Sequence, residues 1–122
     1  MKAILRVLVL VAALGVTTAA LGAPRSHAGT RATVTVRLGE FYFSPKVITV
    51  HVGQKVRFLN VGKIDHTVAD TDSKGNLRSQ LIHPRQLAHG QSQVVTFARP
   101  GTVYYLCTFH PTLMSGRIIV VP

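Results

Sequence analysis

The stretch FYFSPKVITVHVGQKVRFLNVG, residues 41–62, decides the fold class through its alternation of apolar and polar side chains. Residues 48–52 place aliphatic side chains on one face, and residues 56–60 repeat the alternation after the dipeptide Gly53-Gln54. A period of two is typical of a half-buried β-strand, and glycine favours a tight turn. The stretch therefore predicts two strands joined by a tight turn.

Further strands are expected on both sides of this stretch. They share the alternation or an enrichment in β-forming residues, and they cover residues 32–38, 66–69, 93–97, 103–107 and 117–121. Residues 70–90 are polar and are expected to form an irregular loop with room for one helical turn. Short strands at regular spacing, without a sustained helical period, predict an all-β domain: a β-sandwich of about seven or eight strands.

Residues 1–28 are expected to be a secretory signal peptide. Two basic residues give a positive start, residues 7–16 form an uncharged apolar run, and small residues follow. The run is short for a membrane span. We expect cleavage after Ala28, with Ala20 as the alternative site and an uncleaved N-terminal anchor as the alternative outcome. This pattern predicts export to a periplasmic or other extracytoplasmic space.

The remaining chain, residues 29–122, is expected to be one domain with a strongly basic surface. The full chain has a net charge of +10, and three of its 14 basic residues precede residue 29. The domain therefore carries 11 basic residues against four acids, a net charge of about +7. Such charge favours acidic partner proteins, or peripheral contact with an anionic membrane. The basic residues are scattered singly, which argues against nucleic acid as a partner. We expect a monomer.

Cys107, His110 and Met114 lie on one expected loop between two strands, in the stretch YYLCTFHPTLMSG, residues 104–116. Cys107 is the only cysteine, so an internal disulfide is excluded, and a metal would hold its thiolate. A thioether is a fair ligand for copper and a poor one for zinc. His66, far from Cys107 in the sequence, is the best candidate for a fourth ligand. Two His, one Cys and a weak axial Met are the ligands of a blue-copper site.

Each of these residues also has an ordinary structural interpretation. The alternatives are a buried structural thiol for Cys107, a strand-end histidine for His66, an exposed loop histidine for His110 and core packing for Met114. We favour the metal site because the residue types together match one kind of copper centre. The other histidines of the domain are expected to be ordinary strand or loop residues, and they are His51, His83 and His89.

Several short motifs carry a resemblance to a known family. They lie between Phe41 and the C-terminus, and they are FSP (43–45), VHVG (50–53), VRFLN (56–60), DHTV (65–68), YLCTFHP (105–111), Met114 and Gly116. In these motifs the chain resembles the cupredoxins, the small type 1 blue copper proteins, above all the plastocyanin, amicyanin and pseudoazurin branch. One departure is the step of three residues between His110 and Met114.

The resemblance implies a Greek-key β-sandwich that binds one copper ion. His66, Cys107 and His110 would be the equatorial ligands and Met114 the axial ligand. Asn60 would form a hydrogen bond near Cys107 or Thr108. These assignments come from the resemblance and not from spacing alone.

The expected function is that of an exported carrier of single electrons between redox partner proteins, with copper alternating between Cu(I) and Cu(II). The edge of His110 would be the electron port, inside an apolar collar formed by Phe109, Pro111 and Leu113. The alternatives are a copper-binding or copper-delivery protein without an electron-transfer role, and a structural β-sandwich without metal. An enzyme is not expected, because the chain contains neither a nucleophile paired with a base nor paired acids.

Overall fold

The computed structural model describes Leu10, residues 12–22 and residues 30–122. Leu10 and residues 12–22 are exposed and form neither helix nor strand. The expected cleavage point after Ala28 lies outside the described residues, so the signal peptide stays a prediction. The described residues form no helix that is long and apolar enough to cross a membrane.

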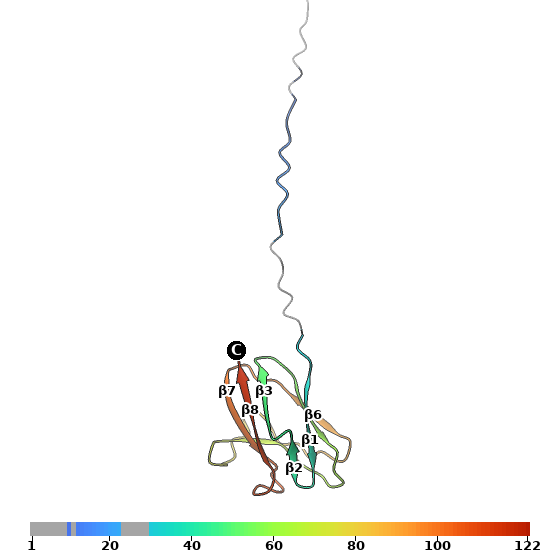
Figure 1. Ribbon diagram of the computed structural model, residues 1–122, viewed down its shortest axis with the longest axis vertical. Coiled ribbons are helices and arrows are strands. Elements are labelled where there is room, and N and C mark those ends of the chain that lie inside the picture. Colours follow the sequence, from blue (N-terminus) through green and yellow to red (C-terminus); the bar gives the residue numbers. More distant parts are fainter. Residues whose placement is uncertain (1–9, 11, 23–29) are drawn as a thin grey trace, which may run out of the picture.

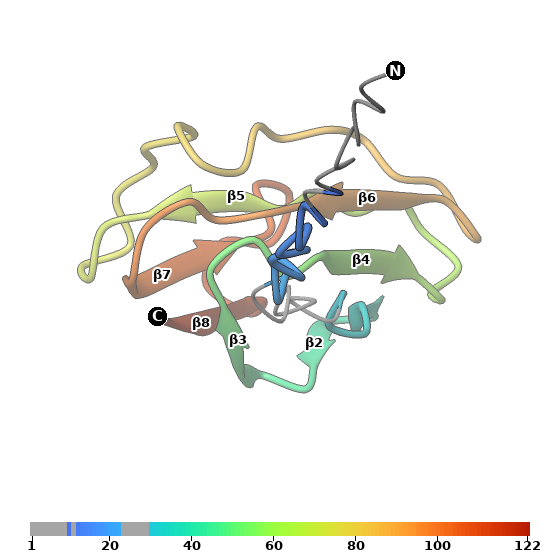
Figure 2. The ribbon, with the colours of Figure 1, turned by 90° about the horizontal axis from the view of Figure 1, so that it is seen from above.

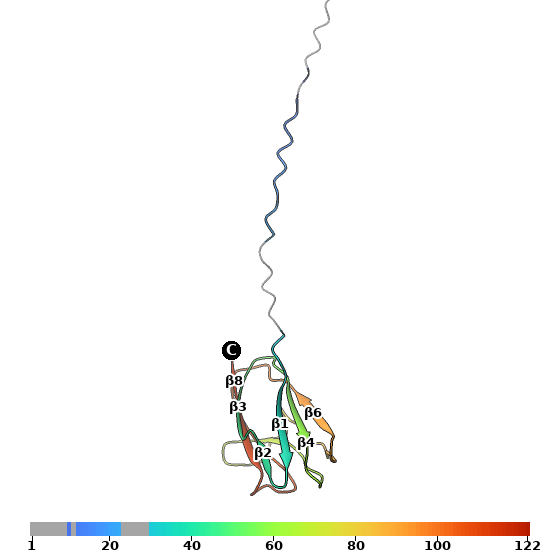
Figure 3. The same ribbon diagram turned by 45° about the vertical axis from the view of Figure 1, so that its right-hand side comes forward.

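Eight strands pair into two four-stranded sheets. Sheet A has the order β2-β1-β4-β6, and its strands are β1 (Val34–Gly39), β2 (Tyr42–Ser44), β4 (Val56–Asn60) and β6 (Ser92–Val95). Sheet B has the order β3-β8-β7-β5, and its strands are β3 (Val47–His51), β5 (Ala69–Thr71), β7 (Gly101–Leu106) and β8 (Ser115–Val121). The sheets form two layers, seen from two sides in Figures 1 and 3 and from above in Figure 2. The predicted all-β sandwich of seven or eight strands is confirmed.

Each sheet contains one parallel pair of strands that lie apart in the sequence. β1 runs parallel to β4, with Leu38 opposite Asn60. β3 runs parallel to β8, with Val47 opposite Arg117. A tight hairpin cannot join parallel neighbours, so the chain crosses between the sheets. The pairing of β3 with β8 holds the N-terminal and C-terminal halves of the domain together.

The structure differs from the predicted strands in three places. The strand expected over residues 66–69 begins later, as β5 (Ala69–Thr71), because the backbone of His66 pairs with Leu87 instead. The short strand β2 (Tyr42–Ser44) forms where no separate strand was predicted. Val52, expected on a buried face, lies beyond the end of β3 and is 40% exposed.

An aromatic cluster fills the core between the sheets. The ring of Phe58 on β4 lies edge-on to Phe43 of β2 and to Tyr105 of β7, with centroids 6.4 Å and 5.2 Å away. Phe43 and Tyr105 meet at 4.9 Å, again nearly perpendicular. Edge-to-face contacts of this kind are favourable for aromatic rings. The cluster joins three strands from both sheets and so fixes the layers that carry the loops.

Several of these loops gather at one end of the sandwich. β1, β4 and β7 all end there, and β2 and β8 begin there (Figures 1 and 3). The two-residue connection Glu40-Phe41, the segment after Asn60 and the loop of residues 107–114 therefore lie at the same end. This is the end at which the predicted metal ligands meet.

Candidate metal centre

Cys107 directly follows β7, and the loop that it opens is closed by backbone hydrogen bonds. The N–H of His110 donates to the carbonyl of Cys107 (3.2 Å), and the N–H of Met114 donates to the carbonyl of His110 (3.0 Å). The N–H of Cys107 donates in turn to the carbonyl of Met114 (3.0 Å). The backbone therefore holds the three loop residues at fixed positions relative to one another.

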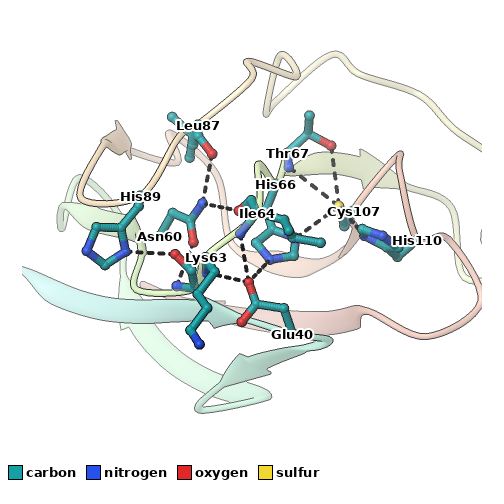
Figure 4. Close-up of polar contacts among 11 residues, drawn as sticks. Glu40, Asn60, Lys63, Ile64, His66, Thr67, Leu87, His89, Cys107 and His110 are labelled. Carbon is teal, nitrogen blue, oxygen red and sulfur yellow. Dashed lines mark hydrogen bonds and ion pairs between the residues drawn. The ribbon is translucent and has the colours of Figure 1, made fainter.

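His66 reaches the same point from a different part of the chain. Its N–H donates to the carbonyl of Leu87 (3.0 Å), and its carbonyl accepts from the N–H of Leu87 (2.8 Å). Its side chain is fully buried, with 0% of its surface exposed. This bridge is the reason that the strand expected over residues 66–69 starts late, and it turns the imidazole toward Cys107 (Figure 4).

The donor atoms of the three predicted equatorial ligands converge. The Sγ atom of Cys107 lies 3.9 Å from Nδ1 of His66 and 3.7 Å from Nδ1 of His110. All three atoms lie within 4.8 Å of one another. Two donors bound to one ion at about 2.0 and 2.3 Å in a trigonal plane are about 3.7 Å apart. The observed separations therefore fit three ligands of a single ion, and Nδ1 is the nitrogen that both histidines present.

Met114 is fully buried beside this group. Its side chain has 0% exposure and belongs to the hydrophobic core cluster. Its backbone contacts both Cys107 and His110, as described above. The position fits an axial ligand and also fits core packing.

Thr67, and not Asn60, holds the sulfur. The N–H of Thr67 donates to Sγ of Cys107 (3.5 Å), and its hydroxyl lies 3.8 Å from the same atom (Figure 4). The Thr67 hydroxyl also accepts from the N–H of Thr108 (2.8 Å). A hydrogen bond to a ligating sulfur orients it and tunes the metal. Sequence reasoning missed this residue, although it follows His66 directly.

The predicted hydrogen bond from Asn60 to Cys107 or Thr108 is wrong. The Asn60 amide donates to the carbonyls of Ile64 and Leu87, both at 2.8 Å, and its oxygen accepts from the N–H of Gly62 (2.8 Å). Asn60 thus closes the turn that follows β4 and ties it to the segment that bridges His66. It positions the ligand indirectly, through the backbone.

A carboxylate that the sequence did not single out faces His66. Oε1 of Glu40 accepts from the N–H groups of Lys63 (2.5 Å) and Ile64 (2.9 Å) and lies 3.6 Å from Nε2 of His66. The N–H of Ile64 contributes most to holding the pKa of Glu40 below its usual value. Burial lowers the pKa of His66, against a smaller opposing effect of Glu40. The lowered pKa of His66 favours the neutral imidazole, which is the form that binds metal.

The aromatic ring of Phe41 covers the histidines. Its centroid lies 4.5 Å from the ring of His110 and 6.5 Å, edge-on, from the ring of His66. His110 is half-buried and Phe41 is 43% exposed. Glu40 and Phe41 belong to no motif, and the one signal in the sequence is their place between two expected strands.

The other histidines of the described chain lie away from this group. His83 is exposed, and His51 is half-buried on β3. His89 contacts the carbonyl of Gly62 through Nδ1 (2.7 Å). The structure thus brings together the predicted residues His66, Cys107 and His110, with Met114 next to them.

Comparison with known proteins agrees with this geometry. A family model described as copper binding proteins of the plastocyanin/azurin family matches residues 30–121. Amicyanin-alpha from Methylorubrum extorquens is 29% identical over 85 residues, which cover 70% of this chain and 69% of that protein.

Solved structures are similar over the same region. A purple cupredoxin from Nitrosopumilus maritimus superposes with a TM-score of 0.67 at 23% identity, covering 72% of this chain and 99% of the other. Oxidised plastocyanin from Dryopteris crassirhizoma gives a TM-score of 0.62 at 25% identity, covering 72% of this chain and 100% of the other. The similarity to the purple cupredoxin shows the fold alone.

Proposed function

The chain belongs to the plastocyanin/azurin family of copper-binding proteins, and we propose that it carries single electrons between redox proteins through one type 1 copper ion. The observation that supports this most directly is the convergence of a buried thiolate and two imidazoles on one point. His66, Cys107 and His110 would hold the ion, with Met114 as a further, weaker ligand that would tune its reduction potential. In this proposal the protein is an electron carrier and not an enzyme.

A copper ion bound there supplies a one-electron couple, and the chain supplies a rigid, dry site for it. His66, Cys107 and Met114 are each 0% exposed, so water is excluded from their donor atoms. Backbone hydrogen bonds fix the ligand loop, and Thr67 orients the sulfur. Ligands that are held in place independently of charge state need little rearrangement when an electron arrives or leaves.

The surface beside His110 suits brief docking. Exposed apolar side chains lie on the segments that surround the centre, and they include Phe41, Ile64, Phe109 and Leu113. Redox encounters use small interfaces of this kind. The partly exposed rings of His110 and Phe41 together form the electron port. Phe41 therefore joins Phe109, Pro111 and Leu113 in the apolar surface predicted around His110.

The partner in this proposal presents an acidic surface. Within residues 30–122, no Lys or Arg lies within 4.0 Å of a carboxylate, and the ion pair found there joins His66 and Glu40. The carboxylate of Asp72, for example, accepts from the N–H groups of Lys74 and Asn76. The positive charges are therefore not neutralised within the fold and remain available to a partner.

Export completes the proposal. Its support is the sequence of residues 1–28 described above, and one cysteine without a disulfide partner is compatible with an extracytoplasmic protein that binds metal. The protein would act as a monomer in a periplasmic or other extracytoplasmic space.

Copper reconstitution tests the function. Residues 29–122 are expressed without metal, loaded with Cu(II), and studied by visible spectroscopy and voltammetry. We expect one copper per chain, an intense visible band from the thiolate and a reversible one-electron wave. Binding without that band, with rapid metal exchange, would support copper delivery. Failure to bind copper would support a structural role.

Met114→Leu tests the axial ligand. Removing the thioether destabilises Cu(II) more than Cu(I), so the reduction potential rises while copper stays bound. We expect a rise on the order of 60–120 mV, which is one to two decades in relative affinity at about 59 mV a decade. Voltammetry measures it, with the exposed neighbour Leu113→Ala as control. An unchanged potential would assign Met114 to core packing.

Charge reversal near the ligand loop tests the acidic partner. Lys46, Lys74 and Arg117 surround a cleft of about 390 Å³ that also touches Pro111 of the loop. In the double variant Lys46→Glu/Lys74→Glu, oxidation by the ferricyanide anion should slow several-fold at low ionic strength, and oxidation by a cobalt(III) tris-phenanthroline cation should accelerate. Stopped-flow kinetics measure both rates.

The matched control carries the same change of charge at the opposite end of the sandwich. Lys55 precedes β4 and Arg99 precedes β7, and both are exposed. The variant Lys55→Glu/Arg99→Glu should alter both rates much less, because its charges lie away from the ligand loop. Equal effects of the two double variants would show that net charge, and not the surface beside the ligand loop, sets the rate.

A further inference from the structure

Two consecutive residues of the β1–β2 hairpin contact both histidines of the proposed copper site. Gly39 pairs with Tyr42, so Glu40 and Phe41 are the two residues of a tight turn. The carboxylate of Glu40 faces Nε2 of His66, and the ring of Phe41 packs against His110 (Figure 4 shows Glu40 and both histidines). We infer that Glu40-Phe41, here called the hairpin clamp, positions both imidazoles for the metal before the metal binds.

Glu40 is anchored by groups other than His66. Its Oε1 atom accepts the N–H groups of Lys63 and Ile64, which belong to the turn after β4. Because two backbone donors hold this oxygen, its place does not depend on a metal or on the charge of His66. The carboxylate therefore has a fixed position, and the imidazole of His66 orients toward it.

The backbone at Gly62 makes room for the Glu40 carboxylate. A Cβ atom added at Gly62 would overlap Oε1 of Glu40 and lie 2.8 Å from its Cδ. Gly62 is buried and is itself fixed by the Asn60 side chain, so the backbone there cannot simply move away. Any larger residue at position 62 would displace the Glu40 carboxylate from its position beside His66.

His66 needs a partner at Nε2. The atom is buried and has no hydrogen-bond partner within 3.5 Å, and the Glu40 oxygen at 3.6 Å is the acidic group beside it. A buried N–H without an acceptor is unfavourable, so the carboxylate favours the tautomer protonated at Nε2. That tautomer leaves the lone pair of Nδ1 facing Cys107, where the proposed ion would bind. Glu40 is thus a positioning residue for His66.

Phe41 acts on the other imidazole. Its ring lies 4.5 Å from the ring of His110 at an angle of 56°, and the ring of His66 lies 5.5 Å from His110 on another side. His110 is therefore packed against two rings on adjacent sides, although it lies on a loop near solvent. These contacts limit rotation of the half-buried ligand away from the ion.

The first experiment examines His66 in the metal-free protein and again with copper. Glu40→Gln keeps an oxygen for the N–H groups of Lys63 and Ile64 and removes the negative charge. Nitrogen-15 NMR of the metal-free protein should show a loss of the Nε2-protonated form of His66. With copper, affinity for Cu(II) should fall about tenfold more than affinity for Cu(I), a rise in potential of about 59 mV.

Asp65→Asn is the matched control. It removes the same charge one residue from His66, but its carboxylate contacts Gln86 (2.6 Å) and not the imidazole. The role of Glu40 would be overturned if Glu40→Gln and Asp65→Asn had the same His66 tautomer and the same reduction potential of copper. The clamp rests on the proposed copper site, but the NMR result does not need copper. Loss of copper binding with the tautomer effect intact would refute the proposed function alone.

A second variant keeps the test valid if Glu40→Gln disturbs the turn. Gly62→Ala has no contact with the imidazole, yet it displaces the carboxylate and should raise the potential in the same direction as Glu40→Gln. In a Glu40→Ala background the same change should have no further effect, because the side chain that it displaces is gone. Additive effects would show that Gly62 and Glu40 act independently and would refute the clamp.

The test of Phe41 is kinetic. Phe41→Leu should accelerate the transfer of Cu(I) to a strong chelator about tenfold, because His110 rotates away more easily. Phe109→Leu is the control, since Phe109 is also about half exposed (50%) and has no ring contact to either histidine among those found in the described chain. Equal release rates in the two variants would overturn the role of Phe41.

Discussion

Cys107→Ser abolishes the intense visible absorption and weakens Cu(II) binding by at least about 100-fold. The absorption requires a copper–thiolate bond, and Cys107 is the only thiol in the chain. Loss of a residue that only supports a ligand costs 10- to 100-fold in affinity, so loss of a ligand exceeds this range. Spectroscopy and competition with a chelator of known affinity measure the two effects.

Two controls accompany this variant. Serine is nearly isosteric with cysteine and can accept a hydrogen bond from the N–H of Thr67. The free energy of unfolding of the metal-free variant should therefore lie within about 2 kcal/mol of that of the parent protein. Adding Ser115→Cys restores one thiol to the same hairpin, at the exposed start of β8, and should not restore the absorption. Blue colour in Cys107→Ser itself would refute the assignment of this residue as a ligand.

Phe58→Ala should lower the free energy of unfolding by about 3–5 kcal/mol. The ring has 0% exposure and contacts aromatic rings of both sheets, so truncation leaves a cavity that the rigid layers cannot close. Domains of this size are stable by about 5–15 kcal/mol, so this loss is a large share of the total. Urea unfolding of the metal-free protein measures it.

Graded variants guard against complete loss of folding. Phe58→Leu keeps most of the apolar volume and should cost clearly less than Phe58→Ala. Val94→Ala, on β6 of the same sheet and 48% exposed, should cost least. If Phe58→Ala were no more destabilising than Val94→Ala, the aromatic cluster would not be the centre of the core.

The fold was predictable because its strands alternate. On β4, the buried positions are Val56, Phe58 and Asn60, with Arg57 exposed between them, as a period of two requires. β2 escaped prediction because three residues are too few to show a period. The late start of β5 escaped because pairing of His66 with Leu87 joins segments 21 residues apart, and strand propensity carries no information on such partners.

The site was predictable where the ligands are local. Cys107 and His110 lie on one hairpin, and a thiolate and an imidazole three residues apart are suitable ligands for a metal. His66 was the best candidate for a fourth ligand from its place in the sequence, the resemblance implied its equatorial role, and the structure places its Nδ1 atom 3.9 Å from Sγ of Cys107. The contacts of Thr67, Glu40 and Phe41 depend on how three loops meet in space. Side chains of ordinary type at such a junction give no signal in a single sequence.

Asn60 shows most clearly which hydrogen bonds a sequence cannot predict. The resemblance implied a hydrogen bond from Asn60 near Cys107 or Thr108, but the side chain has other partners. An amide has two donors and an acceptor, and it bonds to whichever backbone groups the following turn leaves unpaired. Here these groups belong to Ile64, Leu87 and Gly62. Thr67, which follows His66 in the sequence, donates to the sulfur instead.

The burial of Cys107 has a consequence for oxidative damage. In the folded chain the thiol is 0% exposed, so folded protein should resist sulfenic acid formation and disulfide-linked dimerisation. The vulnerable period is the time before folding. That period is lengthened by a topology of high contact order, in which Val47 must find Arg117 across 70 residues of sequence. Slower folding should therefore increase the share of the chain that is lost to oxidation.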